Sequence, residues 1–337
     1  MRSIFNILVS ATTLLATLSA CGSSHIPMSA MRNPMQAMAR PGIRSLNQSS
    51  RPANTLRIAS YNIRNLFDGV QNPGKAAETA KPEKELQALS TAMHDINADI
   101  IGMQEVESKE TLSKFRDRFL GDMGYREVVL IEANDERGID VGLFSRYPVT
   151  SVKSHKDVRF EVPGQGIQGF SRDVLQVRIQ GPNNYFFTVF LTHLKSQHGE
   201  GAADIRRRAE AEAAHRIIQA FQAANPRENV VVMGDFNDVY NVPEIAPLVS
   251  SQSGLGLVDI ANQDLGAGPE VYTYHPKQYR SRIDYILLNQ NMVREYMPKS
   301  VRLYKPFKEG DTWQKLYFYD ASDHIPMTID LAISQDK

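Results

Sequence analysis

The chain of 337 residues is poor in cysteine, in net charge and in long hydrophobic runs. It holds one cysteine, Cys21, so no disulfide can form within it. Basic and acidic residues both number 38, and the formal net charge is zero. The only charged residues among the first 50 are arginines, so the rest of the chain is slightly acidic. A broadly basic surface for nucleic acid is therefore not expected, and a phosphate-bearing substrate would need a local cation to offset the repulsion.

Long hydrophobic runs are also scarce, and the one that we single out lies at the start of the chain. Arg2 precedes an apolar run at residues 4–18, and Leu18-Ser19-Ala20-Cys21 follows. A positive start, a short apolar segment and small residues indicate an export signal, and the run is short for a membrane span. The ending resembles a bacterial lipobox, in which the cysteine becomes the lipidated N-terminus; the alternative is an ordinary secretory signal.

We therefore expect residues 1–20 to be a lipoprotein signal peptide. Residues 21–54 are rich in Ser, Met, Pro, Asn and Gln and predict a flexible tether. The expected location is the bacterial cell envelope, with the exported protein anchored to a membrane through a lipidated Cys21.

Strand patterns dominate the rest of the chain. Helical spacing of apolar residues predicts helices over 82–97 and 202–224. Strands are predicted at 56–63, 99–105, 141–145, 174–179, 185–193, 229–232, 283–288 and 327–331. Several strands are adjacent in sequence, which favours two mixed sheets packed face to face with helices outside. The Gly- and Pro-containing segments 160–171 and 262–282 are predicted to be loops at the rim of a site.

Polar residues recur where these strands end. They are Asn62, Glu105, His193, Asp235 with Asn237, Asp284, and Asp323 with His324. One acid at a strand end is usually a cap or a solvated charge, but the repetition along the whole chain is harder to dismiss. Oxygen donors of this kind suit a hard cation such as Mg²⁺ or Mn²⁺. Without a second cysteine or a His-x-x-x-His pair, a zinc site is not favoured.

This set of strand ends resembles the endonuclease/exonuclease/phosphatase superfamily, which has the DNase I-like fold. Its landmarks appear in order as Ser60-Tyr61-Asn62-Ile63-Arg64, Met103-Gln104-Glu105-Val106, Thr192-His193-Leu194-Lys195, Gly234-Asp235-Phe236-Asn237, Arg282-Ile283-Asp284-Tyr285 and Ser322-Asp323-His324-Ile325-Pro326. The resemblance implies an α+β fold, a four-layer α/β/β/α sandwich of two mixed β-sheets. A site assembled from both ends of the chain implies a single domain, over residues 55–335.

The resemblance also implies roles for individual residues. Glu105 would bind the metal, with Asn62 and Asp323 nearby; the cation would be Mg²⁺ or Mn²⁺, with Ca²⁺ as a further alternative. The catalytic group would be His193, Asp235, Asp284 and His324, with Asp284 orienting His324 and Asp235 positioning the water. Asn237, Arg172 and Lys195 would contact the substrate phosphate. Asp140 is expected, on a looser match, to partner His193.

Other interpretations stay open for several residues. Asp284 and His324 could form a structural pair, and Arg172 and Lys195 could be surface charges. Three consecutive arginines, 206–208, resemble a nucleic-acid patch, but we favour a solvated helix face interleaved with Glu210 and Glu212. Six aromatic residues could stack bases, although core or rim packing is more usual; they are Tyr272, Tyr274, Tyr279, Trp313, Tyr317 and Tyr319.

The expected activity is divalent-metal-dependent phosphodiester hydrolysis. The segment 136–143 and the motifs around His193 and Asp235 look most like bacterial exported nucleases, so nucleic acid is the favoured substrate and an endonuclease the favoured function. The alternatives are a phospholipid or sphingomyelin phosphodiesterase and an inositol-phosphate phosphatase. A non-enzymatic alternative is a surface binding protein that has kept the fold but lost catalysis. We expect a monomer.

Overall fold

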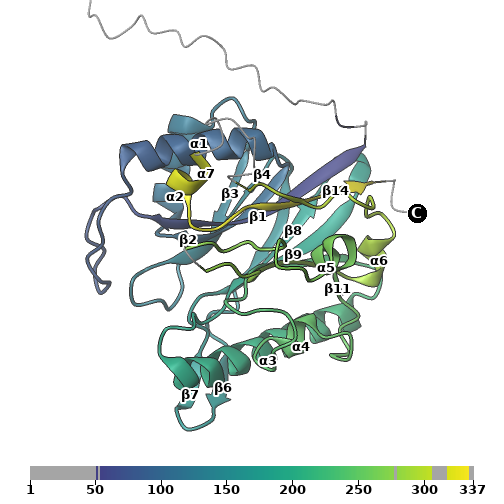
Figure 1. Cartoon of the computed structure of the whole chain (residues 1–337). Helices are drawn as coiled ribbons and strands as arrows, with labels where there is room; N and C mark the ends of the chain where they lie inside the picture. Colours follow the sequence, from purple (N-terminus) through teal and green to yellow (C-terminus); the bar gives the residue numbers. More distant parts are fainter. Residues whose placement is uncertain (1–50, 52–53, 277–278, 306–316, 334–337) are drawn as a thin grey trace, which may run out of the picture. The chain divides into compact units, whose positions relative to one another are not determined.

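A computed structural model describes residue 51 and residues 54–276, 279–305 and 317–333 of the chain (Figure 1). The predicted signal peptide, 1–20, and nearly all of the predicted tether, 21–54, lie outside these residues, as does Trp313. Among the described residues, no helix has both the length and the apolar character needed to cross a membrane. The segment Gln48–Lys337 is one compact unit.

Two six-stranded sheets form the centre of this unit, and each mixes parallel with antiparallel pairs. The first has the order β13-β14-β1-β2-β4-β3, with β1 Thr55–Leu66, β2 Ile100–Val106, β3 Glu127–Leu130, β4 Asp140–Ser145, β13 Arg302–Leu303 and β14 Met327–Ala332. The second has the order β11-β12-β10-β9-β8-β5, with β5 Val149–Lys153, β8 Val174–Gln180, β9 Phe186–His193, β10 Asn229–Asp235, β11 Val258–Asp259 and β12 Asp284–Leu288.

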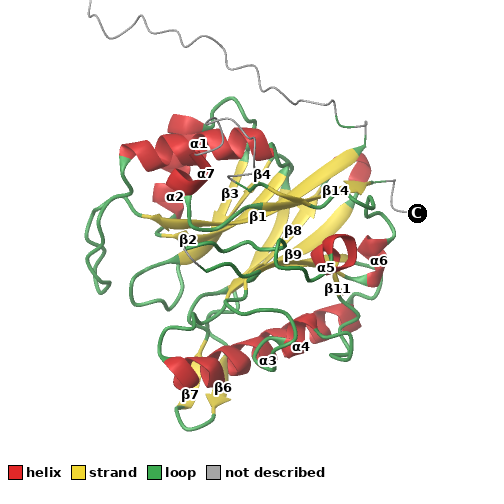
Figure 2. Cartoon of the chain, in the orientation of Figure 1, coloured by secondary structure: helices red, strands yellow, loops and turns green. Residues whose placement is uncertain are grey.

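Helices cover the outer faces of both sheets (Figures 1 and 2). The first sheet is covered by α1 Glu83–Ile96, α2 Lys109–Phe119 and α7 Tyr317–Ala321. The second is covered by α3 Glu200–Ala224 and α4 Ala246–Val249, with the hairpin β6 Arg159–Val162 and β7 Gly166–Gly169 beside α3. The short helices α5 Ile260–Leu265 and α6 Gln290–Val293 flank β12, and a 3-10 turn, Pro182–Asn184, precedes β9.

The period-two pattern of the strands explains the layers. Val231 and Met233 of β10 point into the core between the two sheets, whereas Val230 and Val232 point into the core beneath α3. A third core joins the first sheet to α1 and α2. Because alternate residues of a strand face opposite sides, a strand that is apolar on both faces is buried between two layers. The predicted four-layer α+β sandwich is confirmed.

The main departures from the predicted elements are short ones. Residues 160–171 are not a loop throughout, because β6 and β7 pair there as a hairpin. Its turn uses glycine at positive φ (Gly164, +75°; Gly166, +76°), and four-residue strands are too short for their alternation to stand out from the turn residues. The strands β3, β5, β11 and β13 and the short helices α4, α5, α6 and α7 also lie outside the predicted elements, and so does one longer helix, α2, of 11 residues.

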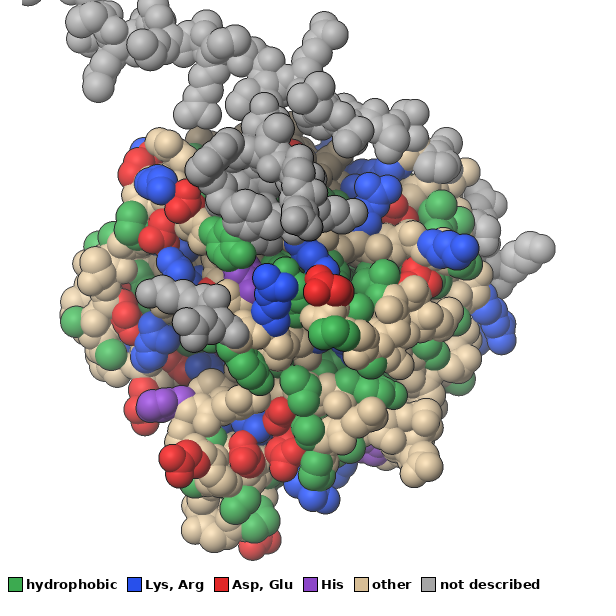
Figure 3. All heavy atoms as spheres, viewed as in Figure 1, with side chains coloured by type: hydrophobic (Ala, Val, Ile, Leu, Met, Phe, Trp, Pro, Cys, Tyr) green, Lys and Arg blue, Asp and Glu red, His purple; other side chains and the backbone are tan. Residues whose placement is uncertain are grey.

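The arginine-rich face of α3 is the second departure. Arg208 and Glu212 form an exposed ion pair, as a solvated face predicts. Arg207 and Glu210, however, are each only 1% exposed, so the expectation of a solvated face is wrong for these two residues. On the face of the molecule drawn in Figure 3, basic and acidic side chains are interspersed, and they do not gather into a field of one sign.

Candidate active site

The register of the second sheet places three predicted site residues side by side. Asp235, at the end of β10, pairs with His193 of β9 on one side and with Asp284 of β12 on the other. The preceding residue, Gly234, has φ +143°, and a Cβ there would collide with the carbonyl oxygen of Thr192. Glycine is therefore required for β10 to approach β9 this closely, which explains its place directly before the aspartate.

At the site, the side chain of Asn62 connects the ends of the two sheets. Asn62 of β1 donates from Nδ2 to Asp235 Oδ2 (3.0 Å) and to Glu105 Oε1 (3.1 Å). Its Oδ1 accepts the backbone N–H of Arg64 (3.0 Å). The amide therefore acts as a donor between two carboxylates, and its oxygen is held by the backbone.

Glu105 owes its orientation to a bulge in β2. Gln104 pairs with Val141 and Val106 with Asp140, so Glu105 is an extra residue, and its φ is +64°. A bulge redirects the side chain of the extra residue, and positive φ is rare outside glycine, so this backbone is strained. Besides Asn62, the Glu105 carboxylate accepts the backbone N–H of Asn65 (3.0 Å).

Asp284 and His324 form a buried pair. His324 Nδ1 lies 2.9 Å from Asp284 Oδ2, and His324 Nε2 lies 3.7 Å from Asp235 Oδ2. Burial opposes the charge on the imidazole, but the carboxylates of Asp284 and Asp235 outweigh it and raise the pKa of His324 to about 10. Burial, and then the Asp284 carboxylate, raise the pKa of Asp235 to about 7. The arrangement leaves His324 Nε2 as the ring nitrogen open to a ligand.

The pKa of His193 is shifted in the opposite direction to that of His324. Burial, followed by the charge of Arg172, lowers its pKa well below the ordinary value, so its imidazole is neutral. Its Nε2 lies 3.6 Å from Asp235 Oδ2, and its Nδ1 has no hydrogen-bond partner among the described residues. The expected partner, Asp140, instead accepts the backbone N–H of Ala133 (2.8 Å), so that expectation is wrong.

The predicted phosphate-binding residues lie around this group, but not equally close to it. Asn237, at φ +56°, donates from Nδ2 to Leu194 O (3.0 Å), and its backbone N–H is held by Asp235 Oδ1 (2.8 Å). Arg172 is 8% exposed; its Nε is 3.0 Å from Asp135 Oδ2 without hydrogen-bond geometry, and its Nη1 has no partner among the described residues. Lys195 turns away, donating to Ser196 Oγ and His198 O.

A cavity of about 300 Å³ lies over these residues. Of the predicted site residues, it is lined by Glu105, Arg172, His193, Asp235, Asn237, Asp323 and His324, but not by Asn62, Lys195 or Asp284. Asn62 and Asp284 lie behind the lining, each bonded to a residue that faces the cavity.

Other lining residues were given no role from the sequence. They include Arg137, Ser196, Gln197, His198 and Ser281. Arg137 bonds Glu78 Oε1 (2.6 Å) and Asn65 Oδ1 (2.8 Å). Its position just before β4 was the available signal, since that strand begins beside the bulge of β2. Of the aromatic candidates, Tyr274 and Tyr279 line the cavity.

The donor set fits a divalent cation. Glu105, Asp235 and Asp323 present carboxylates to the cavity, and hard cations prefer oxygen ligands. Another set of ligand atoms, from Asp235, Asp284 and His324, lies within 4.8 Å of one another. Of these three, Asp284 bonds His324 and does not line the cavity, whereas Glu105 and Asp323 do line it.

Comparison with known proteins places the chain in a family. The profile described as "Endonuclease/Exonuclease/phosphatase family" matches residues 57–251. No curated protein matches the sequence.

Several solved structures share the fold. The human Nocturnin catalytic domain with bound sulfate has a TM-score of 0.57 at 17% identity, covering 83% of this chain and 95% of that one. An endonuclease/exonuclease/phosphatase from Bacteroides vulgatus has a TM-score of 0.56 at 20% identity (83% and 99%). TDP2 of D. rerio, complexed with a single-strand DNA product, has 0.55 at 17% (82% and 98%). Because the family profile covers more than half of its residues, the chain belongs to the endonuclease/exonuclease/phosphatase family.

Proposed function

We propose that this protein is a divalent-metal-dependent phosphodiester hydrolase, and that its substrate is a nucleic acid. The observation that carries the proposal is the two-signed cavity. The cavity is lined both by carboxylates, those of Glu105, Asp235 and Asp323, and by cationic groups, those of Arg137, Arg172 and His324. A metal cation bound by Glu105 and Asp323 would offset the acidic groups, and a phosphate would offset the cationic ones.

The chain's own residues would perform most of the chemistry. Asp235 would orient the attacking water. Asp284 would fix the ring of His324, whose Nε2 would donate to an oxygen of the phosphate. Arg172, Asn237 and the neutral His193 would hold the remaining phosphoryl oxygens. The bound cation, held by Glu105 and Asp323, would neutralise charge on the phosphoryl group. Asn62 would position both Glu105 and Asp235 by donating to each.

Nucleic acid is favoured over lipid by the surroundings of the cavity. Tyr274 and Tyr279 offer aromatic faces on which a base could stack, and Tyr279 is 55% exposed. On the hairpin β6–β7, Ile167 is exposed, but Phe160 and Val162 are buried in the core beneath α3, so the hairpin presents little apolar surface to a bilayer. The structural neighbour from D. rerio was solved with single-strand DNA, which agrees with this choice.

The test compares substrates with one purified protein. The full chain, with Mg²⁺ or Mn²⁺, is incubated with plasmid DNA, RNA, a simple phosphodiester, sphingomyelin and inositol phosphates. Cleavage of nucleic acid that is lost in His324→Ala and kept in Arg208→Ala, on the outer face of α3, supports the proposal. If the folded protein turns over none of these esters, the enzymatic function is refuted; if it prefers sphingomyelin, the nucleic-acid substrate is.

We also propose that the protein is exported and held at a membrane through a lipidated Cys21. The support is the sequence of the first residues: Arg2, the apolar run 4–18 and Leu18-Ser19-Ala20-Cys21. Cell fractionation of the wild type and Cys21→Ser tests this. The variant should leave the membrane fraction, and an unchanged distribution would overturn the anchor.

A further inference from the structure

We propose that helix α3 is a positioning element for the active site, acting through the buried side chains of Arg207 and Glu210, which we call the α3 clamp. The proposal rests on the proposed function, because it concerns how residues of that site are held. Neither clamp residue lines the cavity that contains His193 and His324.

The clamp residues lie on the face of α3 that should be apolar. Ala203, Arg207, Glu210, Ala214 and Ile218 follow one another at helical spacing, and all are buried. Charged side chains are almost never fully buried unless they are paired, so two of them in this stripe require partners.

Both backbone groups of one residue, Lys195, are among those partners. Arg207 donates from Nη1 to Lys195 O (3.2 Å), and Glu210 Oε2 accepts the backbone N–H of Lys195 (2.7 Å). One turn of α3 therefore holds, by hydrogen bonds, the segment that follows β9; the bonded residue, Lys195, is two positions after His193. The carbonyl of Leu194, between them, accepts Asn237 Nδ2 (3.0 Å), so this segment also positions Asn237.

The clamp reaches the other two segments that hold predicted phosphate ligands. Glu210 Oε1 accepts both the backbone N–H (2.8 Å) and the hydroxyl (2.6 Å) of Ser171, which precedes Arg172. Arg207 donates from Nε (2.9 Å) and Nη2 (2.5 Å) to Oδ2 of Asp238, which follows Asn237. Two side chains thus hold the neighbours of Arg172, His193 and Asn237 at once.

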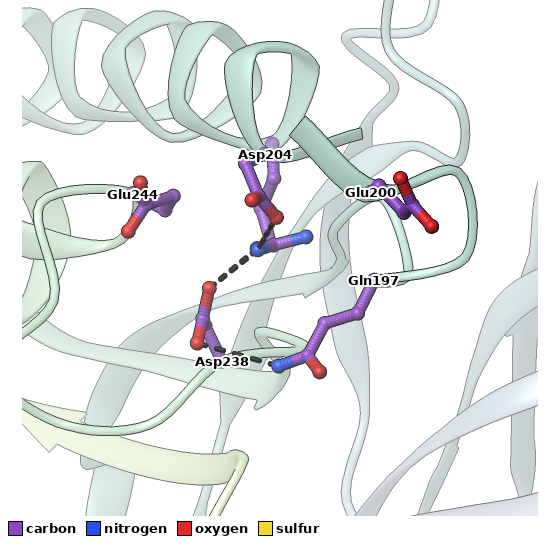
Figure 4. A pocket seen from close by; sticks show the side chains of 6 residues that line it. Gln197, Glu200, Asp204, Asp238 and Glu244 are labelled. Carbon is purple, nitrogen blue, oxygen red and sulfur yellow. Dashed lines mark hydrogen bonds and ion pairs between the residues drawn. The ribbon is translucent and has the colours of Figure 1, made fainter. Parts of the chain in front are cut away.

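A second cavity, of about 370 Å³, shows the outer side of this arrangement. Its lining includes Arg207, Asp204, Asp238 and Gln197, and Asp204 and Asp238 point toward each other across the guanidinium (Figure 4). Gln197 donates to Asp238 Oδ1 (3.4 Å) and also lines the active-site cavity. The clamp therefore lies behind residues that line the active-site cavity.

If the clamp positions catalytic groups, its variants should lose turnover under conditions in which they are still folded. Misplacing a catalytic group by about 1 Å can lower the rate about 100-fold. Glu210→Gln keeps the shape of the side chain but turns one acceptor into a donor, and Arg207→Lys keeps the charge but loses the fork. For both variants of the full chain, we expect kcat to fall about 10- to 100-fold with KM little changed, at a temperature where thermal melts show the protein folded.

Hydrogen exchange gives a measure that does not depend on activity. Peptides covering 194–198 should exchange faster in both variants, and slow exchange should be kept in the control Arg208→Lys, on the exposed face of the same helix. If Glu210→Gln does not fold, Ser171→Ala removes one bond of the clamp while leaving its charges, and a smaller fall in kcat is expected.

The outcomes separate this inference from the proposed function. Variants that melt earlier but retain wild-type kcat and wild-type exchange at 194–198 would show that the clamp only stabilises the fold. A wild type that hydrolyses no phosphoester refutes the proposed function; exchange at 194–198 then decides the clamp, and an unchanged rate overturns it.

Discussion

Two clusters of buried charge lie close together in this protein and differ in how far their polar atoms are satisfied. The first, which we call the strand-end cluster, consists of Glu105, His193, Asp235, Asp284 and His324. In it, His193 Nδ1 and Asp284 Oδ1 have no hydrogen-bond partner among the described residues, and neither does Nη1 of the adjacent Arg172. In the second, formed by the α3 clamp and its partner Asp238, no buried side-chain N or O atom of Arg207, Glu210 or Asp238 is left without a hydrogen-bond partner.

The difference separates two uses of buried charge. An unsatisfied buried polar group costs stability, and such groups persist where a ligand supplies the missing bonds. A fully satisfied cluster fixes the backbone but offers nothing to a substrate. The strand-end cluster therefore has the character of a binding site, and the clamp that of its support.

The largest effect should come from the strand-end cluster. Asp235→Asn removes the carboxylate that lies between His193 and His324, so activity should fall at least about 1,000-fold. The two oxygens of Asp235 accept from Asn62 and from the backbone N–H of Asn237, and the amide can keep only one of these bonds. Since the substitution also removes a buried charge, the two effects oppose each other, and the thermal midpoint should change little. Initial rates and thermal melts of the same preparation check both; retained activity with a lower midpoint would reverse the roles assigned to the two clusters.

Unlike the strand-end cluster, the α3 clamp should lose stability when its charged partner Asp238 is removed. Asp238→Ala leaves the buried guanidinium of Arg207 without its main carboxylate, and removing one partner of such a pair costs about 3–5 kcal/mol of unfolding free energy. Urea unfolding of the wild type and variant measures the difference. A loss below about 1 kcal/mol would mean that Asp204 alone satisfies the guanidinium.

Metal should act on the strand-end cluster alone. At about 100 times its Kd, a divalent cation that binds only the folded protein raises the unfolding free energy by about 2.7 kcal/mol. Mg²⁺ added to EDTA-treated protein should raise the thermal midpoint, and EDTA should abolish activity. Glu105→Gln should remove the Mg²⁺-dependent shift, whereas Arg208→Lys should keep it; an undiminished shift in Glu105→Gln would place the cation elsewhere.

The smallest effect is expected on the exposed face of α3. Arg208 and Glu212 form a pair at 3.1 Å, but both side chains are about half exposed. Surface pairs of this kind are worth about 0–1 kcal/mol, so Glu212→Ala should change unfolding and kcat little. A large effect would mean that the outer face of the helix has a role that its burial does not indicate.

Much of the fold followed from the sequence because it is encoded locally. The alternation along β1 and β10 and the helical spacing in α1 are patterns of a few neighbouring residues. Short elements were not predicted, because a few residues carry too weak a pattern. The strands β6 and β7 are four residues long and are separated by Pro163, Gly164 and Gln165, so turn signals outweigh strand signals.

The site was predictable as a set of residues, but not as a set of contacts. Glu105, Asp235, Asp323 and His324 follow strands or precede one, which the sequence shows directly. The oxygen of Asn62 faces the backbone of Arg64 because of an irregularity within β1, and Lys195 turns toward His198 in the loop after β9. No local pattern specifies either conformation. The roles of these residues remain predictions.

The sequence by itself determined the family, the layers, and which polar side chains stand at the ends of strands, because alternation and motif order are properties of neighbouring residues. Only the tertiary structure decided which charges are buried together. Arg207 and Asp238 are 31 positions apart and Asn62 and Asp235 are 173 apart, and they meet because the packing of α3 and the facing of the two sheets bring them within hydrogen-bond distance. Arg207, which its sequence pattern predicts to be solvated, is thus buried beside the candidate active site.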